Sequence, residues 1–199
     1  MRNVGIVIFD KVEVLDFCGP FEVFSLASLP DAPDRYPEQT LFTAWTIAET
    51  REPIRAVGGL EIVPACTIDD HPPFDLIVVP GGYGTRTIPQ TVVLWIAAQA
   101  PGLEITTSVC TGAGILAQAG LLNGLRATTH WASIDALRSR FPDVTVVDDE
   151  RIVDEGKIIT SAGVSAGIDM ALHVVERLHG HAAAANTARD MEYRWQPVA

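Results

Sequence analysis

The 199-residue sequence contains only three cysteines and no run of basic residues. Cys18, Cys66 and Cys110 stand in no Cys-x-x-Cys or Cys/His spacing, so a disulfide scaffold and a metal site both lose support. Lys and Arg number 14 against 25 Asp and Glu, which gives a formal charge of −11. No basic segment could neutralise a nucleic-acid backbone or an anionic bilayer, so we expect neither nucleic acid nor membrane as a partner.

The sequence also lacks a recognisable signal peptide, an internal repeat and any low-complexity tract. The first apolar run, Val4–Phe9, is too short for the apolar region of a signal peptide and is followed at once by Asp10 and Lys11. The uncharged segment 105–125 is long enough to cross a bilayer, but its glycines and polar side chains indicate a buried strand, turn and helix. A hydrophobic content of 48% is enough for the core of one folded domain over residues 1–199. Because the first apolar run is too short for a signal peptide, we expect this domain to be cytoplasmic.

Short β-branched runs alternate with helical patterns, which predicts an α/β fold with a mostly parallel central sheet. Strands are expected at Val4–Phe9, Leu41–Ala48, Leu76–Val79, Ile105–Val109, Arg126–Thr129, Val144–Val147 and Lys157–Thr160, with a small hairpin strand at Arg151–Val153. Helices are expected at Pro20–Ala27, Gln90–Gln99, Gly112–Ala119, Ala132–Arg140, Ala166–Leu178 and Ala182–Trp195, with Pro20 at a first helical position. One proline-rich loop, Leu29–Gln39, is too short to separate two domains.

Cys110 connects the apolar run Ile105–Val109 to a glycine-rich turn and an apolar helix, the layout of a nucleophile elbow. In an open α/β sheet the ligand crevice lies beyond the carboxyl ends of the strands. A thiol at the positive end of a helix has a lowered pKa, which predicts a reactive thiolate near neutral pH. The alternative is a buried packing cysteine, against which the flanking Gly and Thr residues argue. Cys18 beside a helix start and Cys66 in a short loop are predicted to be structural.

Asp16 follows the first predicted strand at the same carboxyl edge of the sheet. If it faces the thiol, two acidic groups in contact cannot both ionise at low cost, so the carboxyl pKa should rise. A protonated carboxyl could then donate a hydrogen bond to the thiolate and act as a general acid. An ordinary turn or helix-cap aspartate before Gly19-Pro20 is an equally good interpretation.

Two further segments follow predicted strands. Gly81 and Gly82 come directly after Leu76–Val79, where bare backbone N–H groups could stabilise developing negative charge. The segment matches neither glycine-rich phosphate-binding pattern, and a tight structural turn is the alternative. His130 ends another predicted strand and could supply a base, or it could simply satisfy local hydrogen bonds.

Taken together, Ser108-Val109-Cys110-Thr111-Gly112, Pro80-Gly81-Gly82 and the early acidic residue resemble the ThiJ/PfpI superfamily, which is related to class I glutamine amidotransferases. Leu15-Asp16, Thr128-Thr129-His130-Trp131 and the segment 162–169 resemble its cyclohexyl-isocyanide hydratase branch. The resemblance covers nearly the whole chain. It implies a flavodoxin-like three-layer sandwich, usually a homodimer, with neither metal nor organic cofactor.

The same resemblance implies roles for individual residues. Cys110 is the nucleophile, Asp16 replaces the glutamate of deglycase relatives as the acidic partner, and Thr111 contributes to the site. The N–H groups of Gly82 and Thr111 are expected at an oxyanion-type pocket, with Gly81 and His130 beside them. The implied activity is that of a cysteine-dependent lyase that converts a small-molecule isocyanide and water to an N-substituted formamide through a thioimidate. Its apolar substituent could contact Phe17, Tyr83 or Trp131.

Other functions compete with this one. A peptidase of this superfamily would need histidine directly after the cysteine, where this sequence has Thr111, and an amidotransferase would need a base that only His130 could supply. A glyoxalase or deglycase remains possible, although its acidic partner is typically glutamate. The non-enzymatic alternative is a sensor domain like those of AraC-type regulators, although no helix-turn-helix region is expected before the chain ends at Ala199. In such a sensor domain, an accessible thiol could report oxidation by forming a sulfenic acid.

Overall fold

The computed structural model describes residues 1–30 and 40–197, and a seven-stranded sheet forms its centre. The strand order is β10-β11-β7-β6-β1-β2-β5, and every neighbouring pair is parallel except β10 with β11. The strands are β1 (Arg2–Val7), β2 (Phe42–Ala48), β5 (Cys66–Thr67), β6 (Leu76–Val79), β7 (Ile105–Val109), β10 (Ile152–Asp154) and β11 (Ile158–Ser161). The predicted α/β class with a mostly parallel sheet is therefore confirmed.

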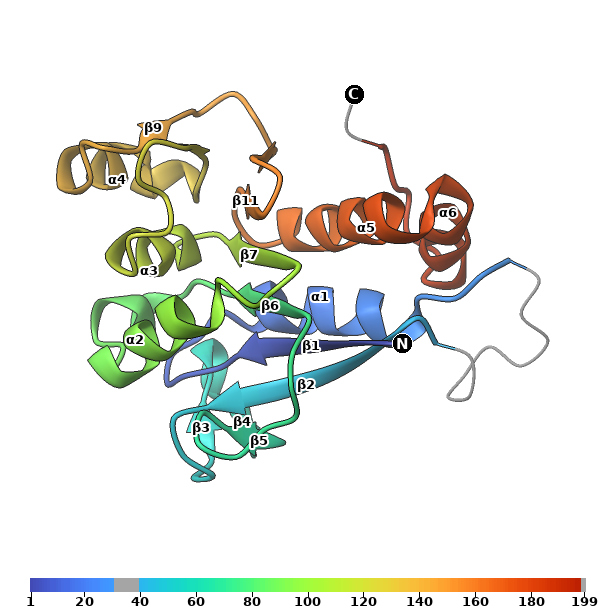
Figure 1. Ribbon diagram of the computed structural model, residues 1–199, viewed down its shortest axis with the longest axis horizontal. Coiled ribbons are helices and arrows are strands. Elements are labelled where there is room, and N and C mark those ends of the chain that lie inside the picture. The colour runs from blue at the N-terminus through green and yellow to red at the C-terminus, as the bar shows by residue number, and fades with distance from the viewer. Residues whose placement is uncertain (31–39, 198–199) are drawn as a thin grey trace.

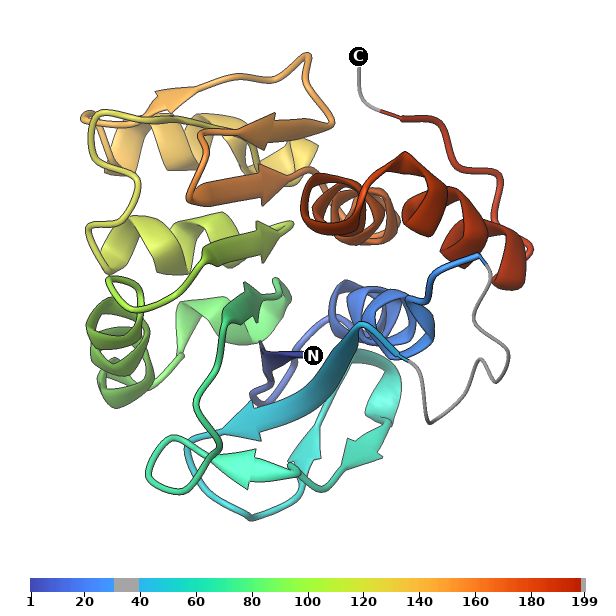
Figure 2. The same ribbon diagram turned by 45° about the vertical axis from the view of Figure 1, so that its right-hand side comes forward.

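Helices cover both faces of this sheet and give the fold three layers (Figures 1 and 2). One side carries α1 (Val14–Leu26), α5 (Ala166–His179) and α6 (His181–Asp190), and the other carries α2 (Gln90–Gln99), α3 (Gly112–Gln118) and α4 (Ile134–Arg140). Short 3-10 turns are η1 (Val57–Gly59), η2 (Tyr83–Arg86) and η3 (Trp131–Ser133). Two small ladders pair β3 (Ile54–Arg55) with β4 (Glu61–Ile62) and β8 (Arg126–Ala127) with β9 (Thr145–Val146). None of the helices in the described part of the chain has the length and apolar character needed to span a bilayer.

The central strands are buried on both faces, as their unbroken apolar runs predict. All four residues of β6 have no exposed surface, and every residue of β7 is buried. Burying each such aliphatic side chain stabilises the fold by roughly 1.5–3 kcal/mol. Since β6 and β7 are parallel, with Val79 opposite Ser108, the turns that follow them emerge at the same edge. This edge is where the sequence places Gly81, Gly82 and Cys110.

Helix α1 begins six residues earlier than predicted, at Val14 instead of Pro20. Pro20 therefore lies inside the helix, where it cannot donate to the carbonyl of Asp16. The helix continues through this position because its buried side chains, Phe17 and Phe24 among them, pack into the core. Burial of this face outweighs the loss of one backbone hydrogen bond.

Several other boundaries differ from the sequence prediction. β8 is shorter than expected and forms a separate two-stranded ladder with β9, and the last helix ends at Asp190 instead of Trp195. Cys66 lies in edge strand β5 instead of a loop. The short strands β3, β4 and β5 were not predicted, because two-residue strands have no measurable periodicity. The predicted loop Leu29–Gln39 lies mostly outside the described residues.

Gly112, at the start of α3, is held against the backbone that follows β6. A Cβ atom at this position would lie 2.0 Å from the carbonyl oxygen of Val79, whereas one at Gly114 in the same helix would meet nothing within 4 Å. We expect Gly112→Ala to lower the free energy of unfolding by about 3 kcal/mol, because backbone must move to admit the methyl group. Gly114→Ala is the matched control and should stabilise the helix by up to about 1 kcal/mol. Urea unfolding curves monitored by circular dichroism measure the stability of both variants. Equal unfolding midpoints for Gly112→Ala and the wild type would contradict the close contact.

Candidate active site

Cys110 lies at a sharp turn between β7 and α3. Its φ angle is 57°, in the left-handed region that non-glycine residues seldom adopt. Its N–H donates to the carbonyl oxygens of Ser161 and Ala162, both at 3.2 Å, and its own carbonyl accepts the Thr129 hydroxyl at 2.7 Å. These contacts hold the strained backbone in place. The predicted layout of strand, sharp turn at Cys110 and helix is therefore observed, and the nucleophilic role of the thiol stays a prediction.

Asp16 is fully buried in the first turn of α1. Its Oδ2 accepts the N–H of Gly81 at 2.9 Å, a contact between the first helix and the glycine turn after β6. Its Oδ1 is buried without a partner at normal hydrogen-bond geometry in the described part of the chain. The helix-cap interpretation is therefore wrong, because the N-cap position belongs to Glu13 and the Asp16 carboxyl points into the protein.

Burial raises the pKa of Asp16 to about 6, against the lowering effect of the Gly81 N–H. Burial, followed by the negative charge of Asp16, raises the pKa of the Cys110 thiol to about 12. The N–H and hydroxyl of Thr111 act on the sulfur in the opposite direction. The expectation of a lowered thiol pKa is wrong, because desolvation and a neighbouring carboxylate outweigh the start of a seven-residue helix.

The two pKa values describe a pair of coupled acids. Between about pH 6 and about pH 12 the pair carries one proton and one negative charge. When the proton lies on the carboxyl oxygen, Cys110 is a thiolate and Asp16 is a neutral acid. Transfer of that proton within the pair therefore creates a nucleophile and a proton donor together, without exchange with solvent.

The glycine turn after β6 contacts Asp16 and also Thr111, the residue that follows Cys110. The Gly82 N–H donates to Oγ1 of Thr111 at 2.9 Å, and a Cβ atom at Gly81 would lie 2.5 Å from the Thr111 nitrogen. Gly81 thus orients Asp16, and Gly82 orients Thr111. The Gly82 N–H, predicted to stabilise negative charge in the pocket, is already bonded to Thr111. The N–H of Thr111 itself acts on the Cys110 sulfur.

His130 lies at the same pocket but has a local role. Its Nδ1 accepts the N–H of Ala132 at 3.3 Å and so caps η3. A Cβ atom at Gly163 would lie 2.3 Å from its ring, so the ring is packed closely against that loop. Among the described residues, no hydrogen bond joins His130 to Cys110 or Asp16. Of the two interpretations left open by the sequence, the structure favours the local hydrogen bond.

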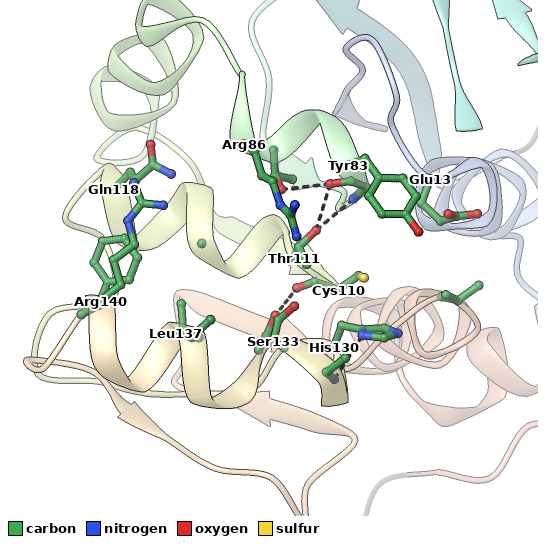
Figure 3. Close-up of a pocket in the computed structure, with 18 residues that line it drawn as sticks. Glu13, Tyr83, Arg86, Cys110, Thr111, Gln118, His130, Ser133, Leu137 and Arg140 are labelled. Carbon is green, nitrogen blue, oxygen red and sulfur yellow. Dashed lines mark hydrogen bonds between the residues drawn. The ribbon is translucent and has the colours of Figure 1, made fainter. Parts of the chain in front are cut away.

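A pocket of about 410 Å³ opens beside the Cys110 sulfur, a volume suited to a small molecule (Figure 3). Tyr83 lines it, as predicted. Phe17 and Trp131 do not: the first is 3% exposed in the core, and the second is 81% exposed to solvent. The sequence prediction missed Arg86, Gln118 and Arg140 in the pocket wall, because they come from η2, α3 and α4 and share no motif.

Comparison with known proteins agrees with this architecture. Residues 2–177 match the DJ-1/PfpI family. Isonitrile hydratase of Pseudomonas putida is 36% identical over 197 residues, which cover 98% of this chain and 80% of that protein. The HTH-type transcriptional regulator GbdR of Pseudomonas aeruginosa is 29% identical over 180 residues, which cover 90% of this chain but only 47% of the regulator. This chain thus matches about half the length of that regulator.

The crystal structure of a ThiJ/PfpI family protein from Pseudomonas syringae superimposes with a TM-score of 0.83 at 29% sequence identity. That match covers 98% of this chain and 76% of the other. The sequence match, the three-layer fold and the cysteine elbow all indicate the same relationship. This chain belongs to the DJ-1/PfpI family.

Proposed function

We propose that the protein is an isocyanide hydratase, which adds water to a small isocyanide to give an N-substituted formamide. The observation that carries this proposal is the arrangement of the buried Asp16 carboxyl and the Cys110 turn beside a pocket of about 410 Å³. The raised pKa values of both groups indicate that they share a single proton at neutral pH. The reaction needs a nucleophile and an acid at the same carbon atom, and this pair supplies both. The 36% identity to the P. putida isonitrile hydratase supports the same substrate class.

In the first step, the proton of the Cys110 thiol passes to the Asp16 carboxylate. The resulting thiolate attacks the terminal carbon of the isocyanide, and a carbon–sulfur bond forms. Negative charge develops on that carbon, and Asp16 delivers its proton there. The product is a thioimidate, R–N=CH–S–Cys110, and Asp16 is left as the carboxylate. The Gly81 N–H then stabilises this carboxylate, since it already donates to Oδ2.

In the second step, Asp16 acts as a base and takes a proton from water while the hydroxide adds to the thioimidate carbon. The same proton passes to nitrogen and gives R–NH–CH(OH)–S–Cys110. The carbon–sulfur bond then breaks, the hydroxyl proton returns to Asp16, and the formamide R–NH–CHO leaves. Cys110 is a thiolate and Asp16 a neutral acid once more, so isocyanide and water are the only net reactants. The Thr111 N–H and hydroxyl, which lower the thiol pKa, stabilise the departing sulfur.

The proposal is tested by incubating the purified protein with cyclohexyl isocyanide and following cyclohexylformamide by chromatography. We expect multiple turnovers per protein chain, whereas heat-denatured protein should give only the uncatalysed rate. An inert protein whose Cys110 is rapidly oxidised by low peroxide would instead support a sensor role. Consumption of glyoxal without isocyanide turnover would support a glyoxalase.

We further propose a homodimer, as the family resemblance implies. Two large side chains near the pocket, Tyr83 and Trp131, are 68% and 81% exposed in the single chain. Association of two copies could shield such apolar surface from water. Light scattering during size-exclusion chromatography should give twice the 21.4 kDa chain mass, and a monomer would contradict the proposal.

A further inference from the structure

Two arginines without an acidic partner, Arg86 and Arg140, line the pocket that contains Cys110. Within the described part of the chain, neither guanidinium forms an ion pair. Most other described arginines do pair with carboxylates: Arg2, Arg51, Arg55, Arg126, Arg138, Arg151 and Arg177. In a chain with a formal charge of −11, two unpaired cations at one pocket are a local exception.

The charges are arranged along the pocket. In Figure 3, Arg140 and Gln118 lie at one end, Glu13 and Tyr83 lie at the opposite end, and Cys110 and Arg86 lie between them. The guanidinium of Arg140 lies over the ring of Phe141, 5.3 Å from its centroid. This contact restrains the side chain but leaves its positive charge uncompensated.

The pocket wall around α4 and α3 is partly apolar. Leu137, Ala136 and Gly114 contribute to it. A ligand that extends from the sulfur toward Arg140 would therefore meet apolar surface first and a cation afterwards. Guanidinium groups bind carboxylates with two parallel hydrogen bonds, and the Gln118 amide can donate another.

We propose that the preferred substrate is an isocyanide that carries a carboxylate on the far side of an apolar spacer. Arg140, with Gln118 beside it, binds the carboxylate, and the isocyanide carbon lies at Cys110. Arg86 lies between these two points and adds positive charge along the path of the substrate. This inference rests on the proposed hydratase function and adds the chemical class of the substituent. Glu13 at the opposite end disfavours the reversed orientation, because it would repel the carboxylate.

The test compares 4-isocyanobenzoate with its methyl ester, which has nearly the same shape and no charge. We expect wild-type protein to show a higher kcat/KM for the acid, and this preference should shrink as salt is added. The double variant Arg86→Gln/Arg140→Gln should lower the ratio of kcat/KM for acid over ester by about 10-fold, since each partly exposed ion pair contributes a few-fold. Thermal unfolding of the variant checks that it is folded.

Arg138→Gln is the matched control, because Arg138 lies on the same helix, pairs with Asp148 and is not part of the pocket. Its ratio of acid to ester should equal that of the wild type. Wild-type protein that hydrates acid and ester equally well would overturn the inference and leave the hydratase proposal intact. A double variant that keeps the full preference would also overturn it.

If neither isocyanide is hydrated, the hydratase proposal is overturned. The carboxylate site is then tested separately by a binding measurement. Calorimetry with Cys110→Ala protein compares 4-formamidobenzoate with its methyl ester. Tighter binding of the acid, lost in the triple variant with Arg86→Gln and Arg140→Gln, supports a carboxylate site at this end of the pocket. Equal binding of acid and ester overturns it.

Discussion

Replacing Cys110 by alanine is expected to reduce isocyanide hydration by about 10⁴-fold or more, because the covalent route disappears with the sulfur. The fold should persist, since alanine fills most of the space of the buried cysteine and its backbone contacts come from Ser161, Ala162 and Thr129. Initial rates of formamide production measure the effect, and urea unfolding confirms that the variant is folded.

Cys66→Ala is the matched control for this substitution. Cys66 lies in β5, at the opposite edge of the sheet from β10 and four strands away from β7, and its thiol donates to the carbonyl oxygen of Thr46. Its removal should leave the hydration rate within a few-fold of wild type. A Cys110→Ala protein that kept even a tenth of the wild-type rate would show that the sulfur is not the nucleophile.

The central part of the fold could be predicted because its signals are local and strong. The apolar runs of β6 and β7 and the pattern of α2 give their boundaries to the residue. The start of α1 could not be predicted in this way. Gly19 and Pro20 indicate a helix start, whereas the buried side chains of Phe17 and Phe24 belong to one helix that begins six residues earlier, at Val14. Such tertiary packing is invisible to a local pattern.

The candidate site could also be predicted from the sequence only in part. Cys110 and Asp16 could be placed at one sheet edge, because parallel strands bring the turns after them together. The pKa of the thiol could not be predicted, since it depends on how completely the fold removes water from the sulfur. Arg86 and Arg140 could not be found either, because only the folded chain brings η2 and α4 to the same pocket.

Replacing Asp16 by asparagine is expected to lower the hydration rate by about 10²- to 10⁴-fold, the usual contribution of a general acid. The amide keeps the shape of the carboxyl group but delivers no proton to the developing carbanion. Glu22→Gln, an exposed change on the same helix, is the matched control and should keep the wild-type rate. Initial rates at neutral pH measure both.

The pH profile distinguishes a proton donor from a residue that only supports the pocket. In the wild type, activity should fall as the pH drops through about 6, because a second proton then binds and the pair can no longer form a thiolate. In Asp16→Asn this acidic limb should vanish.

The negative charge that helps to raise the pKa of the Cys110 thiol is also gone in this variant. Cys110 should therefore titrate below its wild-type value of about 12, although burial still holds its pKa above that of an ordinary thiol. The residual rate, and the alkylation of Cys110 by iodoacetamide, should therefore rise steadily toward alkaline pH. An acidic limb that stayed near pH 6 in the variant would assign that proton to another group and remove Asp16 from the mechanism.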